Sequence, residues 1–214
     1  MNYEALRKMM VREQICSRGI KDSRVIASFL KVERHKFIPE KNRNSAYADH
    51  PVPIGEGQTI SQPYIAALMT ECLELKGNER ILEIGTGSGY QAAILAELAK
   101  EVFSVERFPT LAQQARSVLE GSGYSNIKVK VEDGTLGWKE EAPFDRIIVT
   151  AASPEIPQPL IDQLGEGGKL IMPIGETFSQ VLTVAEKKNG ELVSRGVCGC
   201  VFVPLVGKFG KGEA

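Results

Sequence analysis

The sequence has no long apolar run. No stretch among its 214 residues approaches the roughly 18 consecutive apolar positions that a membrane-spanning helix needs. The opening segment MNYEALRKMMVREQ also lacks the apolar centre of a signal peptide. We therefore expect a cytoplasmic protein that does not contact membranes.

The sequence also lacks an excess of charge of either sign. Lysine and arginine together number 26 and aspartate and glutamate 27, so the formal net charge is −1. Proteins that hold a phosphate backbone do so by releasing counterions to a basic surface. This composition supplies no such surface, and nucleic acid is not expected as a partner.

Residues that bind metals or form redox pairs are few. The two histidines, His35 and His50, are expected to be loop or packing residues. No cysteine stands in the C-x-x-C spacing of zinc and redox sites; they are Cys16, Cys72, Cys198 and Cys200. Alternation in GVCGCVFVPL places the last two on one face of a predicted strand, as reduced thiols. No metal site and no disulfide are predicted.

Helical signals dominate the first third of the chain. Periodic apolar positions predict helices over residues 2–18, 22–32 and 63–75. Gly19 is expected to end the first helix and Asp22 to cap the second. Residues 39–61 are broken by proline and glycine, and we expect no regular element there. A loop of this length is uncommon without a function.

Strands and helices alternate in the rest of the chain. Strands are predicted over residues 80–84, 101–106, 126–133, 144–151 and 168–175, and helices over 90–99, 109–120 and 157–164. This alternation indicates an α/β protein with a doubly wound, mostly parallel sheet. Asn189-Gly190 between two strand-like runs predicts an antiparallel hairpin at the C-terminal end. We expect one domain, with a helical extension and active-site loop (1–78), a cofactor-binding core (79–175) and antiparallel C-terminal strands (176–214).

A glycine-rich loop, LEIGTGSGYQ, follows a predicted strand and opens a helix, the context of a nucleotide site. Glu106 ends the next strand, where a carboxylate can accept hydrogen bonds from both ribose hydroxyls. The loop reads G-x-G-x-G, not the dinucleotide fingerprint G-x-G-x-x-G. Glu83 suits a positive sulfonium and ammonium group, and Asp133 could accept from an adenine amino group. These residues favour S-adenosylmethionine over NAD.

The stretch GQTISQPYIA (57–66) contains no charged residue, histidine or cysteine. Pro63 suits the first turn of a helix, and Ser61 is a good capping residue. Thr59, Ser61 and free backbone N–H groups would then lie at the positive end of a helix, which is an anion site. The alternative is that Ser61 only caps the helix.

The chain from about residue 32 to 205 resembles the protein-L-isoaspartate (D-aspartate) O-methyltransferases. The segments that carry the resemblance are RHKFIPEKNRNSAYADHPVPIGEGQTISQPYIAALM, ILEIGTGSGYQAA, VFSVER, DGTLGW, FDRIIVTAA, PQPLIDQLGEGGKLIMPIG and VFVPL. Glu132 departs from the family, which more often has glycine there. The resemblance implies methylation of the α-carboxyl of L-isoaspartyl residues, and of the β-carboxyl of D-aspartyl residues, in damaged proteins. S-adenosyl-L-methionine would be the donor and S-adenosyl-L-homocysteine the product.

The resemblance also implies roles for individual residues. Ser61 would be the catalytic residue, binding the substrate carboxylate by a hydrogen bond. Substrate-binding candidates besides Ser61 are Thr59, Ile60, Gln62, Val203 and Leu205. Cofactor-binding candidates are Glu83, Gly85, Thr86, Gly87, Ser88, Gly89, Glu106, Arg107, Asp133 and Gly134. VFVPL would support the peptide substrate or form a plain edge strand, and the resemblance implies that the last strands are exchanged relative to ordinary methyltransferases.

Three other functions fit parts of the pattern. A methyltransferase acting on a small molecule, or on another protein carboxyl or amide, would share the cofactor fold. An NAD-dependent oxidoreductase would need a proton-donating group in the cleft. A binding module would keep the fold without activity. We expect a monomer that acts on damaged proteins.

Overall fold

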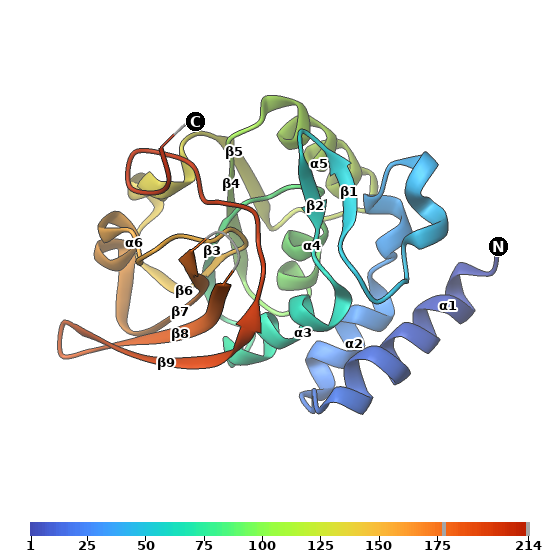
Figure 1. The fold of residues 1–214 in the computed structure, drawn as a ribbon, viewed down its shortest axis with the longest axis horizontal. Helices are drawn as coiled ribbons and strands as arrows, with labels where there is room; N and C mark the ends of the chain where they lie inside the picture. Colours follow the sequence, from blue (N-terminus) through green and yellow to red (C-terminus); the bar gives the residue numbers. More distant parts are fainter. Residues whose placement is uncertain (177–178, 213–214) are drawn as a thin grey trace.

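A computed structural model describes residues 1–176 and 179–212. Its centre is a seven-stranded sheet of order β5-β4-β3-β6-β7-β8-β9 (Figure 1). The strands are β3 (Arg80–Ile84), β4 (Glu101–Glu106), β5 (Ile127–Val131), β6 (Phe144–Val149), β7 (Leu164–Glu176), β8 (Ser179–Lys188) and β9 (Glu191–Cys200). The first five strands in spatial order are parallel, and the last two are antiparallel. The doubly wound, mostly parallel sheet is therefore confirmed.

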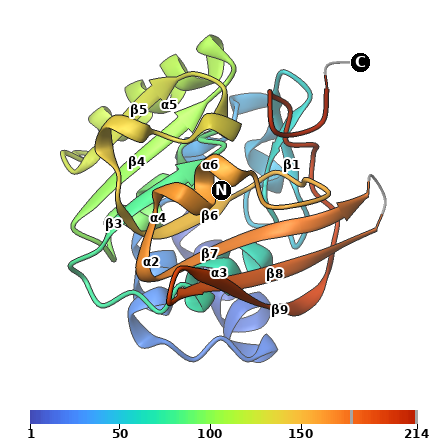
Figure 2. The same ribbon diagram turned by 90° about the vertical axis from the view of Figure 1, so that its left-hand side faces the viewer.

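Helices cover both faces of the sheet. They are α1 (Tyr3–Met10), α2 (Ser23–Lys31), α3 (Pro63–Cys72), α4 (Tyr90–Ala96), α5 (Pro109–Gly121) and α6 (Gln158–Gln163). Figure 2 shows α6 in front of the strands and α3 behind β7 and β8. Buried strand residues alternate between two clusters, so that Ile81 packs with α3 and α4 whereas Leu82 packs with α6. The apolar strands are buried on both faces, as in other parallel sheets.

The N-terminal helical segment begins and ends close to its predicted limits. Helix α1 continues through a π-helical turn (Val11–Ile15) and a 3₁₀ turn (Cys16–Arg18). Gly19 ends the segment at φ +97°, a conformation that glycine adopts at little cost. The Asp22 carboxylate accepts a hydrogen bond from the Arg24 N–H at the start of α2, as a capping residue should.

The expectation of no regular element over residues 39–61 was wrong. This segment contains a 3₁₀ helix (Glu40–Ser45) and an antiparallel hairpin of β1 (Val52–Gly55) and β2 (Gln58–Ile60). Gly55, Glu56 and Gly57 all have positive φ, which lets the chain reverse within the turn. The glycines that signalled a loop in the sequence are therefore the glycines that make the hairpin.

The C-terminal hairpin is confirmed. Asn189 and Gly190, at φ +54° and +81°, form the turn between β8 and β9. Strand β8 pairs with β7, so the chain adds its last two strands to the sheet in sequential order. Cys198 and Cys200 lie half-buried in β9, and all four cysteines are free. None of the helices in residues 1–176 and 179–212 is long and apolar enough to cross a bilayer.

Two predicted boundaries moved where the chain passes from α6 to β7. The helix ends at Gln163, and β7 begins at Leu164, four residues before the predicted start of 168. The pairing of β6 with β7 shifts register between Phe144 and Arg146. This shift allows Leu164, ahead of the glycine-rich residues, to pair with Phe144. Apolar periodicity did not predict this extension, because three of the five residues in LGEGG (164–168) are glycines and have no side chain.

Candidate functional site

The glycine loop lies at the carboxyl end of β3, between β4 and β6. The strand order reverses at β3, because β4 and β5 lie on one side of it and β6 and β7 on the other. Open α/β sheets bind ligands at such a reversal. A cavity of about 130 Å³ lies on the loop, and a smaller cleft of about 40 Å³ adjoins it. The residues that line both are Thr59, Gly85, Gly87 and Thr150. The cavity and the cleft therefore form one continuous candidate site.

Close packing explains why the loop needs glycine. Gly85 has φ +96°, and a Cβ there would lie 2.4 Å from Thr150 Oγ1. Thr150 Oγ1 lies within hydrogen-bonding distance of the carbonyl oxygens of Ile84 and Gly85, at 3.1 and 3.0 Å. Gly89, at φ +85°, is the N-cap of α4. Glycine at position 85 thus allows Thr150 to pack directly against the loop backbone.

Glu106 lies in the cavity wall, as the sequence predicted for a ribose-binding residue. The residue is 5% exposed, and its carboxylate accepts hydrogen bonds from the N–H groups of Gly87, at 2.7 Å, and Phe108, at 3.0 Å. Each carboxylate oxygen has two acceptor positions, so both can accept another hydrogen bond. The carboxylate is therefore oriented and still able to bind a pair of hydroxyls.

Glu83 lies behind the loop and lines neither the cavity nor the cleft. Its side chain is fully buried and accepts a hydrogen bond from the Ser104 hydroxyl, which also lies 2.5 Å from Thr86 Oγ1. Burial raises the pKa of Glu83 to about 8. The hydrogen bond from Ser104 acts in the opposite direction, and the negative charge of the nearby Glu106 raises the pKa further. Ser104 and Thr86 thus link Glu83 to the site by hydrogen bonds, and its charge is coupled to that of Glu106.

The Glu83 pKa predicts a pH dependence of stability. The folded-state pKa of about 8 exceeds the ordinary value of 4.5, so the folded protein holds an extra proton between these values. The stabilisation is complete below pH 4.5 and is lost, by roughly 3 to 5 kcal/mol, as the pH rises through 8. Thermal unfolding of the native protein and Glu83→Gln from pH 5 to 9 measures it. The variant should gain melting temperature relative to the native protein as pH rises; a constant difference would contradict the assignment.

Asp133 is not directed into the cavity. Its Oδ1 accepts hydrogen bonds from the N–H and hydroxyl of Thr135, at 2.8 and 2.7 Å, and its Oδ2 accepts from the Lys208 N–H at 2.8 Å. The neighbouring Gly134 does line the cavity, and a Cβ there would lie 2.5 Å from Ile84 Cγ2. The acidic side chain therefore anchors the C-terminal segment, which returns to this end of the sheet (Figure 1).

Ser61 lines the small cleft together with Gly85, Gly87 and Ser88 of the glycine loop. It is half-buried and so remains accessible. The alternative, that Ser61 only caps α3, is wrong, because Gln62 occupies the N-cap position and no side chain caps the helix. The Ser61 hydroxyl is therefore not used in capping.

The other substrate-binding candidates divide between the site and its surroundings. Thr59 and the buried Ile60 line the cleft, whereas the Gln62 amide donates to Asp49 Oδ1 at 2.8 Å and lies outside it. Val203 and Leu205 line the cavity. The backbone of VFVPL pairs with Ala152 through a single parallel bridge centred on Pro204, so it is not a regular edge strand.

The remaining cofactor candidates line the site except for Gly89. Thr86 and Ser88 lie in the cleft, and Arg107 lies in the cavity wall with its guanidinium 5.0 Å from the centre of the Phe108 ring. Gly89 lines neither space, and a side chain there would lie too close to α5, since its Cβ would be 3.3 Å from that of Ala115. This agrees with a glycine that allows helix packing and does not contact a ligand.

Two site residues were missed by the sequence analysis. Thr150 directly follows β6. Its position could have indicated a site residue, because the carboxyl ends of adjacent parallel strands meet at the ligand site. Arg34 is fully buried, and its Nη2 donates to the Ser61 carbonyl at 2.7 Å while its Nε donates to the Ala46 carbonyl at 2.7 Å. No sequence pattern indicated that this arginine holds the Ser61 backbone, since the two residues are 27 positions apart.

Comparisons with known proteins agree on one family. Residues 5–210 match the family model described as protein-L-isoaspartate(D-aspartate) O-methyltransferase. The protein-L-isoaspartate O-methyltransferase of Geobacter metallireducens is 56% identical over 213 residues, which cover 99% of each chain. That of Methanoculleus marisnigri is 56% identical over 204 residues, covering 95% of this chain and 93% of the relative.

Solved structures give the same result. One described as a protein-L-isoaspartate O-methyltransferase superposes with a TM-score of 0.85 at 29% identity, covering 95% of this chain and 67% of the other. A second, from Plasmodium falciparum and in complex with S-adenosyl-L-homocysteine, has a TM-score of 0.81 at 32% identity and covers 96% and 98%. The sequence, the fold and the glycine-lined site thus agree, and the chain belongs to the protein-L-isoaspartate (D-aspartate) O-methyltransferase family.

Proposed function

We propose that the substrate carboxylate binds in the small cleft between Ser61 and the glycine loop. The protein is an S-adenosylmethionine-dependent methyltransferase of the isoaspartate repair family. Its reaction esterifies the α-carboxyl of L-isoaspartyl residues, and the β-carboxyl of D-aspartyl residues, in damaged proteins. The observation that supports this placement is that the Ser61 cleft and the Glu106 cavity share four lining residues.

The cavity fits the cofactor. Gly85 and Gly134 let the backbone of the cavity wall pack against Thr150 and Ile84, and Glu106 is oriented to accept from the ribose hydroxyls. Ile84, Val105, Phe108 and Leu205 add apolar walls suited to an adenine ring. When bound, S-adenosylmethionine supplies an electrophilic methyl group on a positively charged sulfur. These groups would hold the cofactor beside the cleft.

The cleft suits an acceptor that is already ionised. A free carboxyl group has a pKa near 4, so its conjugate base is present at neutral pH without a general base. The described residues that line the cleft include no histidine, cysteine, lysine or carboxylate side chain. No group there would repel the substrate carboxylate or compete with it as a nucleophile. Positioning of the two reactants and exclusion of water then remain as the sources of catalysis.

Ser61 would hold the carboxylate by donating a hydrogen bond, with Thr59 as a second donor. Hydrogen bonds to a charged group contribute about 1.5 to 3 kcal/mol each. Arg34 would act as a positioning residue because its guanidinium fixes the Ser61 carbonyl from the buried side. The cation lies 4.9 Å from the centre of the Tyr90 ring, which stabilises it in the interior.

The product ester would continue the repair without further help from the enzyme. A methyl ester is a better electrophile than a carboxylate, so the neighbouring backbone nitrogen can attack the ester carbon and close a succinimide ring, with loss of methanol. Hydrolysis of that ring would return part of the damaged residues to the normal aspartyl linkage. Flexible or unfolded segments are the expected partners, since the acceptor must reach into the cleft.

A paired-substrate assay tests the function. The purified protein is incubated with methyl-labelled S-adenosylmethionine and an isoaspartyl peptide or its normal aspartyl twin. We expect label on the isoaspartyl peptide and almost none on the twin. Equal labelling of both, or labelling only of small-molecule carboxylic acids, would show a methyltransferase of different specificity.

A further inference from the structure

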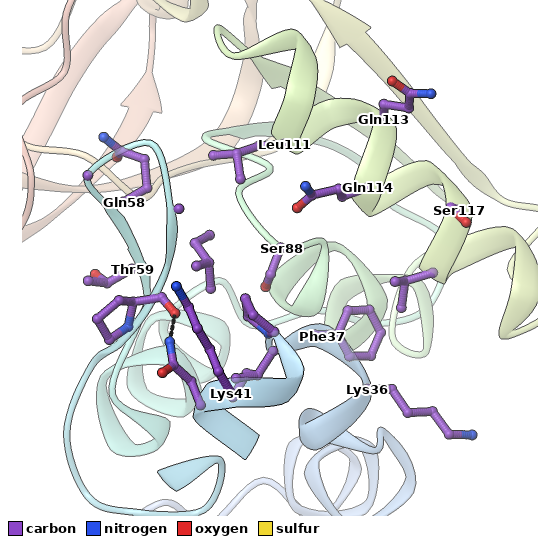
Figure 3. Close-up of a pocket in the computed structure, with 18 residues that line it drawn as sticks. Lys36, Phe37, Lys41, Gln58, Thr59, Ser88, Leu111, Gln113, Gln114 and Ser117 are labelled. Carbon is purple, nitrogen blue, oxygen red and sulfur yellow. Dashed lines mark hydrogen bonds between the residues drawn. The ribbon is translucent and has the colours of Figure 1, made fainter. Parts of the chain in front are cut away.

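A second, larger hollow of about 1120 Å³ lies beside the Ser61 cleft, and we call it the lysine groove. Figure 3 shows its three walls, which are the 3₁₀ segments at Arg34–Phe37 and Glu40–Ser45, the β1–β2 hairpin, and helix α5. Thr59 and Ser88 line both the groove and the cleft. A chain bound at Ser61 therefore has a direct path into the groove.

The groove carries positive charge and hydrogen-bonding amides. Lys36 and Lys41 line it, and none of the described lining residues is acidic. Its amide side chains are Asn42, Gln58, Gln113 and Gln114. Amides both donate and accept hydrogen bonds, which matches the N–H and C=O groups of an extended peptide backbone.

Lys41 is the cation available to a ligand. Lys36 forms an ion pair with Glu33, whereas the Lys41 side chain has no partner within residues 1–176 and 179–212. It is exposed and projects into the groove (Figure 3). The next residue, Asn42, donates to the Pro53 carbonyl at 2.8 Å and so fixes the backbone here against the hairpin.

Acidic groups at the rim are already engaged or face elsewhere. The Glu56 carboxylate accepts from the Thr110 hydroxyl at 2.7 Å, which ties the hairpin turn to the start of α5. Glu40 precedes Lys41 in sequence and is exposed, but it does not line the groove. The charge inside the groove is thus positive, and an anionic segment would be attracted to it.

We propose that the lysine groove binds the stretch of polypeptide that flanks the methylated residue, and that Lys41 makes the enzyme prefer a flank carrying a carboxylate. This inference rests on the proposed function, because it places the acceptor carboxylate at Ser61. An exposed ion pair has a modest effect, so the expected preference is about three- to fivefold in kcat/KM at low salt. Screening should reduce it as salt is raised.

The test uses isoaspartyl peptides that differ only in their flanks. One set carries glutamate on the N-terminal or the C-terminal side, and the matched set carries glutamine. The native protein should favour the glutamate flank on one side. Lys41→Gln should remove the preference, and Lys41→Glu should reverse it.

Two further variants sharpen the result. Lys100→Gln changes the charge equally at an exposed site at the opposite end of the sheet, and it should keep the preference. Gln114→Glu places a carboxylate on the α5 wall and should weaken the preference as Lys41→Gln does. Thermal unfolding of each variant checks that the fold is intact.

The outcomes separate this inference from the proposed function. Native protein that methylates no isoaspartyl peptide would overturn the function itself. Native protein that methylates glutamate- and glutamine-flanked peptides equally well would overturn the groove proposal alone. A preference that survives Lys41→Glu would do the same, because the charge responsible would then lie elsewhere.

Discussion

Replacing Gly85 with alanine is expected to lower methyl transfer at least a hundredfold. The residue has φ +96°, where an L side chain costs about 1 to 3 kcal/mol, and the new Cβ would lie 2.4 Å from Thr150 Oγ1. The loop must move to relieve this contact, and the Gly87 N–H that orients Glu106 would move with it. Calorimetric titration with S-adenosyl-L-homocysteine and kcat/KM with an isoaspartyl peptide measure the loss.

Two variants separate the collision from backbone strain. Gly77→Ala places alanine at φ +110° with nothing within 4 Å, so it should lower the unfolding temperature and leave product affinity unchanged. Gly85→Ala combined with Thr150→Ala removes the colliding oxygen and should recover part of the affinity. Unchanged affinity in Gly85→Ala alone would show that this loop does not hold the cofactor.

Loss of the Ser61 hydroxyl is expected to reduce kcat/KM for an isoaspartyl peptide by roughly ten- to a hundredfold. The hydroxyl would be lost as a donor to the substrate carboxylate, while the Ser61 carbonyl would keep its hydrogen bond from Arg34. Ser61→Ala should therefore bind S-adenosyl-L-homocysteine with native affinity and unfold at nearly the native temperature. Steady-state kinetics and calorimetry on the same preparation make the comparison.

The matched control for this variant is Ser194→Ala, an exposed serine in β9. It removes the same hydroxyl at a position remote from the glycine loop and should retain native kinetics. If Ser61→Ala also retains full activity, Ser61 does not bind the substrate carboxylate, and the assignment of the cleft must be abandoned.

Local signals predicted most elements of the fold. The Asn189-Gly190 turn, the Gly19 helix end and the Asp22 cap all depend on the conformation of one or two residues, and all three are confirmed. The β1–β2 hairpin was missed because its strands are short and interrupted by Pro53. Pairing across the hairpin, which the sequence does not display, decides that these residues form strands.

The candidate site was predicted less evenly. Glu106 lines the cavity, as its position at the end of a parallel strand after a glycine loop predicted, and its ribose-binding role stays a prediction. Glu83 and Asp133 carry the same functional group at neighbouring strand ends, yet neither lines the cavity. Their hydrogen bonds, to Ser104 and to the C-terminal segment, depend on side-chain direction and on a distant part of the chain.

The sequence by itself determined the parallel sheet, the glycine loop and the family, because apolar period, backbone freedom and motif spacing are properties of short segments. Only the tertiary structure decided which carboxylates line the cavity, that Arg34 donates to the Ser61 carbonyl, and that Lys41 lines a groove beside the site. These depend on burial and on hydrogen bonds between residues far apart in the chain. Such contacts exist only after the helices and the hairpin have packed against the sheet.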